Sequence, residues 1–105
     1  MRHQFLLASV IIAMVCATSP SLAQGGADTY KAKCMMCHAA DGSGNTPAGK
    51  SMGALSFKTA SLLKASDADL TAATTNGKGK MPAYKTQLTD AQISALITYI
   101  RTLQK

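Results

Sequence analysis

The chain has 105 residues and a formal charge of +6, with 11 Lys and Arg against 5 Asp and Glu. This length allows one small domain, and no run of residues reaches the 18 or so apolar positions that a membrane-spanning helix needs. Length and composition therefore exclude a multidomain protein and predict no stable insertion into a membrane.

The first residues are typical of a secretory signal peptide. Arg2 and His3 form a basic start, residues 5–17 form a short apolar block, and small residues precede Gln24. We therefore expect export of the chain and cleavage after Ala23. An uncleaved membrane anchor is the alternative, and the shortness of the apolar block argues against it.

Cleavage there divides the chain into a leader, residues 1–23, and an exported domain of 82 residues, 24–105. The domain keeps two of the three cysteines and a formal charge of +5, because Arg2 leaves with the leader. A domain of this size has a marginal core and usually needs an additional staple. A disulfide between Cys34 and Cys37 would close too short a loop to stabilise the domain much. We therefore expect a group other than protein side chains to fill the interior.

The hydrophobic pattern predicts an all-α domain with about four short helices and long loops, because no segment alternates like a strand. In chain order we expect a helix over about 27–37, a turn-rich stretch over 41–49, a loop with a short helix carrying Phe57 within 51–65, a helix from Leu70 to Asn76, an irregular segment over 77–84 and a final helix after Thr89.

Two capping boxes mark the starts of the last two helices. Ser66 pairs with Asp69 at the first of them, and Thr89 pairs with Gln92 at the second. The final helix is the clearest element, because its apolar residues recur on one face: Ile93, Leu96, Ile97, Ile100 and Leu103.

The string Cys34-Met35-Met36-Cys37-His38 is the motif that carries chemistry. In a C-x-x-C-H segment the two thiols can add to the vinyl groups of haem, and the adjacent histidine then lies beneath the iron as its proximal ligand. Positions i, i+3 and i+4 share one face of a helix, which gives this spacing its physical reason. A zinc site needs four ligands, and a thioredoxin-type pair needs strands, so both alternatives fit the chain less well.

With this motif, Met81-Pro82 and the closing Leu96-x-x-Tyr99 helix make residues 26–104 resemble the class I c-type cytochromes, in particular the short bacterial monohaem members. The resemblance implies one covalently attached haem c (heme c) inside a small helical fold whose first and last helices cross. It also implies that Tyr99 packs near Gly26 and Tyr30.

A second iron ligand has to be a methionine, because His3 leaves with the leader. Met35 and Met36 lie inside the attachment loop, which leaves Met52 and Met81. Met81 follows glycines that let the backbone approach a flat ring, and it matches the distal ligand position of the family. We expect Met52 to pack in the core.

The predicted site therefore comprises Cys34 and Cys37 as the attachment points of the haem, with His38 and Met81 as iron ligands. This is the His/Met pair found in cytochromes c. No catalytic residue is expected.

The resemblance raises three further points around the haem. In the family a proline carbonyl accepts a hydrogen bond from the proximal histidine, and Pro47 is either that residue or an ordinary turn proline. Ala39 stands where a glycine often follows the histidine. Because the chain has no Trp, Lys50 and Lys58 are candidate partners of the haem propionates on charge alone.

An iron with both axial positions filled has no vacancy for oxygen, peroxide or substrate. We therefore expect a periplasmic one-electron carrier and not an enzyme. It should be a monomer that binds no nucleic acid and meets redox donors and acceptors with acidic docking faces through Lys78, Lys80 and Lys85. The alternatives are a haem enzyme or gas sensor, a dedicated subunit of one larger dehydrogenase or oxidase, and a haem-free thiol protein.

Overall fold

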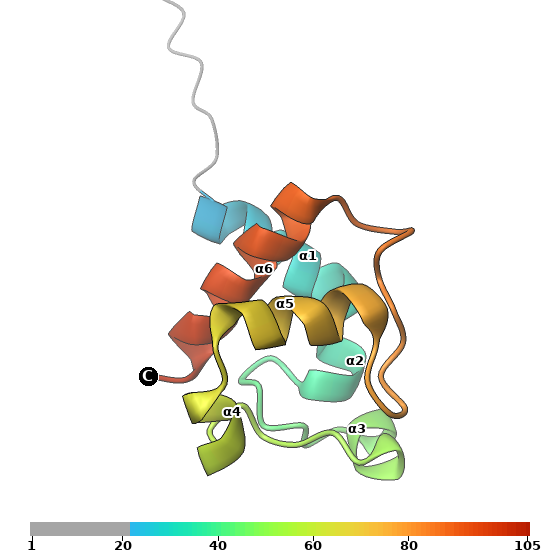
Figure 1. The fold of residues 1–105 in the computed structure, drawn as a ribbon. Coiled ribbons are helices and arrows are strands. Elements are labelled where there is room, and N and C mark those ends of the chain that lie inside the picture. The colour runs from blue at the N-terminus through green and yellow to red at the C-terminus, as the bar shows by residue number, and fades with distance from the viewer. Residues whose placement is uncertain (1–21) are drawn as a thin grey trace, which may run out of the picture.

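The computed structural model describes residues 22–105. All of the predicted leader except its last two residues therefore lies outside the described residues. The described part is all-α, as predicted, but it has six helices rather than about four (Figure 1). They are α1 (Leu22–Lys33), α2 (Met35–His38), α3 (Pro47–Met52), α4 (Ala60–Lys64), α5 (Asp67–Asn76) and α6 (Asp90–Leu103).

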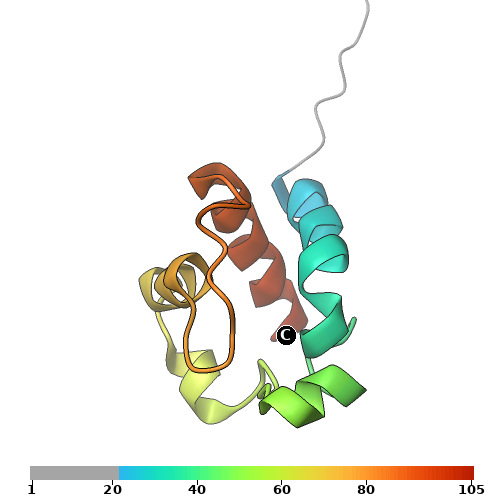
Figure 2. The same cartoon turned by 90° about the vertical axis from the view of Figure 1, so that its right-hand side faces the viewer.

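The first and last helices cross and pack against each other more extensively than any other pair of helices in the described residues (Figures 1 and 2). A side chain at Gly26 would collide with the backbone carbonyl of Ala95, so a glycine allows the close approach of α1 and α6. Beside this crossing, the rings of Tyr30 and Tyr99 lie 5.2 Å apart. The expected contact of Tyr99 with the first helix is thereby confirmed.

The predicted start of α6 is also confirmed. The Thr89 hydroxyl accepts a hydrogen bond from the Gln92 N–H at 3.1 Å, and the Thr89 N–H donates to Oε1 of Gln92 at 2.9 Å. From this cap the helix directs its apolar face into the core, where each large side chain contributes about 1.5–3 kcal/mol on full burial. The buried residues of that face are Ile93, Leu96, Ile97 and Ile100.

Helix α5 begins earlier than predicted. Ser66 caps it through reciprocal hydrogen bonds with Asp69, and the first helical residue is Asp67 rather than Leu70. A capping residue immediately precedes the first helical residue, so the capping box itself should have placed the start there. The helix ends at Asn76, as expected.

Three predictions for the first half of the domain were wrong. Cys34 interrupts the helix predicted over 27–37 and separates α1 from α2. Helix α3 starts inside the stretch predicted as irregular, because Thr46 caps it and Pro47 occupies its first position. Phe57 precedes α4 instead of belonging to it.

Within residues 22–105, none of the helices has both the length and the apolar character that crossing a lipid bilayer requires.

Candidate functional site

A cavity of about 500 Å³ lies between the helices, and all four predicted site residues line it. Cys34, Cys37 and His38 come from the α2 region, and Met81 comes from the loop that follows α5. In Figure 2 this loop runs down the front of the molecule, between α5 on one side and α2 on the other. Most of the exposed cavity wall is apolar, which suits a large flat hydrophobic ligand.

One helical turn presents the attachment residues together. The Cys34 N–H donates to the Tyr30 carbonyl at 2.8 Å at the end of α1, and the His38 N–H donates to the Cys34 carbonyl at 2.9 Å. Residues three and four positions apart share a helix face. Cys37 and His38 therefore follow Cys34 on the side that lines the cavity.

His38 is held by packing against an aromatic ring. Its imidazole stacks on Phe57 with the ring centroids 4.8 Å apart and the planes at 27°. Gly42 has φ +75°, and a side chain there would come within 2.5 Å of the Phe57 ring. The glycine therefore leaves room for the ring that supports the histidine.

Burial lowers the pKa of His38, so its imidazole is neutral at neutral pH. Its Nδ1 is buried and has no hydrogen-bond partner among residues 22–105. The bond to the Pro47 carbonyl that the resemblance suggested is thus absent, and Pro47 serves as the first residue of α3. A neutral imidazole and a thioether are nonetheless the iron donors that a haem c takes, and two thiols beside the same apolar cavity are its attachment points. The residues present therefore fit this group.

Thr46 fastens α3 to the attachment segment. Its hydroxyl donates to the Met36 carbonyl at 2.6 Å and accepts from the Gly49 N–H at 2.9 Å. Gly49 is buried against the Cys37 carbonyl and has no space for a side chain. Sequence reasoning missed this contact, although a Thr-Pro pair is a recognised helix start.

The residue after the histidine is strained. Ala39 has φ +66° and ψ 165°, a region that is essentially restricted to glycine. Its carbonyl accepts a 2.6 Å hydrogen bond from the hydroxyl of Tyr30. Burial raises the pKa of Tyr30, so its hydroxyl remains a donor at neutral pH. The buried tyrosine thereby holds the chain in this conformation as it leaves the attachment segment.

We expect Ala39→Gly to stabilise the protein. Glycine removes a strain of about 1–3 kcal/mol and loses about 0.5–1 kcal/mol to extra freedom in the unfolded chain. The net gain of roughly 1 kcal/mol should raise Tm by about 4–8 °C in a thermal melt. Ala40→Gly is the matched control, because Ala40 is exposed and has no positive φ, and it should leave Tm unchanged or lower it. A Tm for Ala39→Gly at or below that of Ala40→Gly would contradict the strain.

The segment that carries Met81 is a tight turn. The Lys78 N–H donates to the Met81 carbonyl at 3.1 Å, and the Met81 N–H donates to the Lys78 carbonyl at 3.0 Å. Gly79 supplies the positive φ of +57° that the turn requires. Further along, the Tyr84 N–H donates to the Thr74 carbonyl of α5 at 3.0 Å. The turn and this anchor keep Met81 at the cavity wall.

Met52 is not a core residue, contrary to the prediction. It is 46% exposed and lies at the rim of the same cavity. Met52 ends α3, and α3 packs against α2, the helix that carries His38. Met81 lines the cavity from the loop after α5 instead, so it comes from a segment separate from the helix that carries His38.

The two thiols are free and Cys34 is weakly reactive. Cys34 is buried and forms no disulfide with Cys37. Burial, with a smaller contribution from the neighbouring Cys37, raises the pKa of Cys34 to about 11. The thiol is therefore protonated at neutral pH, unlike the depressed-pKa cysteines of thiol redox proteins.

A helical fold that encloses an apolar cavity beside a C-x-x-C-H segment defines the class of c-type cytochromes. The sequence matches the family described as cytochrome c oxidase, cbb3-type, subunit III, over residues 21–100, and the chain belongs to this family. It is a small monohaem class I c-type cytochrome, an electron-transfer protein with covalently attached haem c, as the resemblance implied.

Two relatives illustrate the range of this family. The chain is 37% identical over 82 residues to cytochrome c6 of Leptolyngbya boryana, covering 74% of this chain and 88% of that protein. It is 34% identical over 88 residues to the cbb3-type cytochrome c oxidase subunit CcoP of Azospirillum brasilense, covering 82% of this chain. The match spans only 30% of CcoP.

Solved structures agree with the fold. The KustC0563 c-type cytochrome superimposes with a TM-score of 0.68 at 31% identity, covering 76% of this chain and 98% of that one. A chain of the Kuenenia stuttgartiensis reducing HAO-like protein complex Kustc0457/Kustc0458 gives a TM-score of 0.71 at 22% identity, over 84% of this chain and 47% of that chain. This second likeness concerns the fold alone.

Proposed function

We propose that this protein is a periplasmic one-electron carrier whose haem c is attached through Cys34 and Cys37 and ligated by His38 and Met81. One observation carries the proposal: these four side chains, from two separate parts of the chain, line a single apolar cavity. When bound there, the haem supplies an iron that cycles between ferric and ferrous states.

The protein side chains set the properties of that iron. The neutral imidazole of His38 can donate its ring nitrogen without first losing a proton. The soft sulfur of Met81 favours the ferrous state, and the apolar wall disfavours the extra charge of the ferric state. Both effects raise the reduction potential. If His38 and Met81 both held the iron in each oxidation state, electron transfer would require little rearrangement of the protein.

Ligation of the iron by both His38 and Met81 would also distinguish a carrier from a haem enzyme or gas sensor. A carrier should take up one electron per chain in a reductive titration, and its ferrous form should not bind carbon monoxide at neutral pH. Carbon monoxide binding at low concentration, with peroxidase activity, would favour the enzyme instead. The protonated state of Cys34 weighs against a thiol redox protein.

A role as a dedicated subunit of one larger complex is the second candidate, because the chain matches part of CcoP. A diffusing carrier should elute as a monomer and reduce more than one acceptor. A dedicated subunit should instead remain bound to one complex through purification. The export itself is tested by cell fractionation, where processing after Ala23 should yield a periplasmic protein that begins at Gln24.

Electron transfer with an acidic redox partner should slow as ionic strength rises. The charged side chains that line the cavity within residues 22–105 are Lys33, Lys78 and Lys80, and none of its lining residues is acidic. With the haem charges included, the formal +5 of the exported domain becomes about +4 oxidised and about +3 reduced. Steering by such a surface acts on the on-rate and fades as salt shortens the Debye length.

Lys80→Glu should therefore lower the bimolecular rate about tenfold at low salt, and the difference should shrink at high salt. Lys105→Glu makes the same charge change at the C-terminus, which lies far from the loop after α5 in Figure 1, and should cost much less. These rates are measured by stopped-flow mixing. If the rate changed neither with ionic strength nor with Lys80→Glu, the lysines would serve only to keep the protein in solution.

A further inference from the structure

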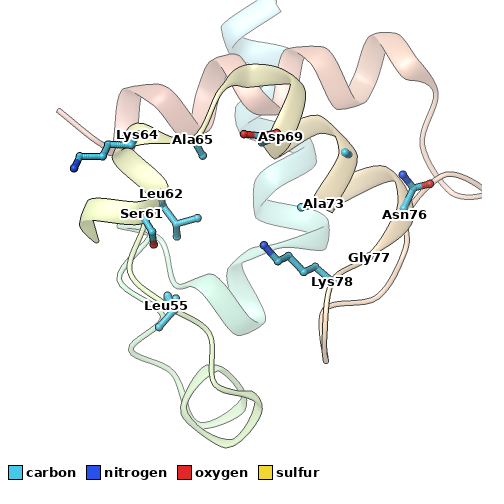
Figure 3. Close-up of a pocket in the computed structure, with 11 residues that line it drawn as sticks. Leu55, Ser61, Leu62, Lys64, Ala65, Asp69, Ala73, Asn76, Gly77 and Lys78 are labelled. Atoms are coloured by element: carbon cyan, nitrogen blue, oxygen red, sulfur yellow. The ribbon is translucent and has the colours of Figure 1, made fainter.

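A hollow between α4 and α5 continues the haem cavity toward solvent (Figure 3). Leu55, Leu62, Ala73 and Lys78 line both the cavity and the hollow, so the two spaces share a wall. No residue of the attachment segment lines the hollow. The hollow therefore opens from a part of the cavity away from the cysteines.

The two propionate carboxylates of haem could extend into this hollow. The vinyl groups of the haem occupy one half of the macrocycle and its two propionate carboxylates occupy the other half. If Cys34 and Cys37 hold the vinyl half, the carboxylates face the part of the cavity away from the cysteines. A carboxylate is costly to bury in an apolar cavity unless it is paired with a cation or reaches water. The hollow can provide both.

Lys78 is the cation in the right place. Among the charged side chains of residues 22–105, it alone lines both the cavity and the hollow. In Figure 3 it extends from the loop after α5 into the hollow toward α4, where Ser61 and Leu62 lie. Lys64 also lines the hollow, but its side chain points away from it.

Three other features agree with this assignment. Asp69 is the acidic residue of the hollow, and its carboxylate is engaged in the cap of α5, where it accepts a hydrogen bond from the Ser66 N–H at 3.4 Å. Lys50 and Lys58, considered for the propionates on charge alone, line neither the hollow nor the cavity. The backbone of Lys78 is fixed by its two hydrogen bonds to Met81.

We propose that Lys78 pairs with a haem propionate in the hollow between α4 and α5, with the Ser61 hydroxyl as a second donor, and so links that carboxylate to the turn that carries Met81. This inference rests on the proposed haem attachment. The pair balances one negative charge close to the iron. Losing the lysine leaves that charge uncompensated and stabilises the ferric state.

The test compares Lys78→Met, Lys78→Arg and Lys64→Met in the intact haem protein. The electron-exchange equilibrium with a mediator of fixed potential is measured at low salt, together with the carboxylate bands of the redox-difference infrared spectrum. Lys78→Met should shift the equilibrium roughly tenfold toward the ferric protein and move a carboxylate band. For Lys78→Arg and for Lys64→Met, the equilibrium constant should stay within about twofold of the wild-type value.

Equal equilibria for Lys78→Met and Lys64→Met, or unmoved carboxylate bands, would overturn the assignment. The substitutions change side chains alone, so the backbone hydrogen bonds between Lys78 and Met81 remain available. Covalent haem and the sulfur-to-iron absorption band are measured in the wild-type protein as well. If either were missing there, the proposed function would fail. If both were present and Lys78→Met behaved like Lys64→Met, this inference alone would fail.

Discussion

Replacing both cysteines, Cys34→Ser with Cys37→Ser, should yield a protein that keeps no haem after acid–acetone extraction and loses most of its helical circular dichroism. The serine hydroxyls cannot form the thioether bonds. Without haem, a cavity of about 500 Å³ would be left unfilled, and unfilled apolar volume costs up to about 24 cal/mol per Å³. The penalty is on the order of 10 kcal/mol, as large as the whole stability of a small domain.

Met36→Ser is the control for this double substitution. Met36 lies between the two cysteines but is 78% exposed, so its loss should leave both haem and helicity in place. Urea titrations of the two variants, monitored by circular dichroism, show whether each variant unfolds cooperatively. A haem-free double variant that unfolds cooperatively would show that the cavity can close without a cofactor, and the central role of the haem in folding would be wrong.

Met81→Ala should convert the carrier into a protein with an open iron site. The methionine sulfur stabilises ferrous iron, so its loss favours the ferric state. The equilibrium ratio of ferric to ferrous protein should rise at least about tenfold, which corresponds to about 1.4 kcal/mol. The vacant position should bind carbon monoxide and support weak peroxidase activity. Potentiometry and a peroxidase assay on the purified variant measure both effects.

Met52→Ala is the decisive comparison, because Met52 lines the same cavity. Met52 ends α3, which packs against the helix that carries His38. Because Met52 is exposed, its loss should cost little stability. We expect an unchanged potential and no peroxidase activity. If Met52→Ala opened the iron and Met81→Ala did not, the two methionines would have to exchange roles.

Sequence alone predicted the features that short segments determine. The spacing of Cys34, Cys37 and His38 fixes a shared helix face whatever surrounds it. The capping boxes of α5 and α6 depend on residues three positions apart. These local rules gave the helical class and the predicted attachment residues, whereas Met81 was predicted by elimination and from the ligand position of the family.

The remaining features depend on contacts between distant segments. Nothing near Met52 indicates that α3 would place it at the cavity rim, because that position depends on how α3 packs against α2. The stacking of Phe57 on His38 likewise joins residues 19 positions apart. The contact of Lys78 with the hollow depends on how α4 and α5 lie on either side of that hollow, which no sequence period encodes.

An absorption spectrum of the purified protein, oxidised and reduced, tests the central claim most directly. His38 and Met81 as axial ligands predict low-spin iron in both states, with the weak long-wavelength sulfur-to-iron band in the oxidised protein. After denaturation the haem should remain attached to the chain, with the pyridine haemochrome spectrum of two thioether bonds. A high-spin oxidised spectrum without the sulfur band, or haem that dissociates on denaturation, would contradict a covalently bound, His/Met-ligated electron carrier.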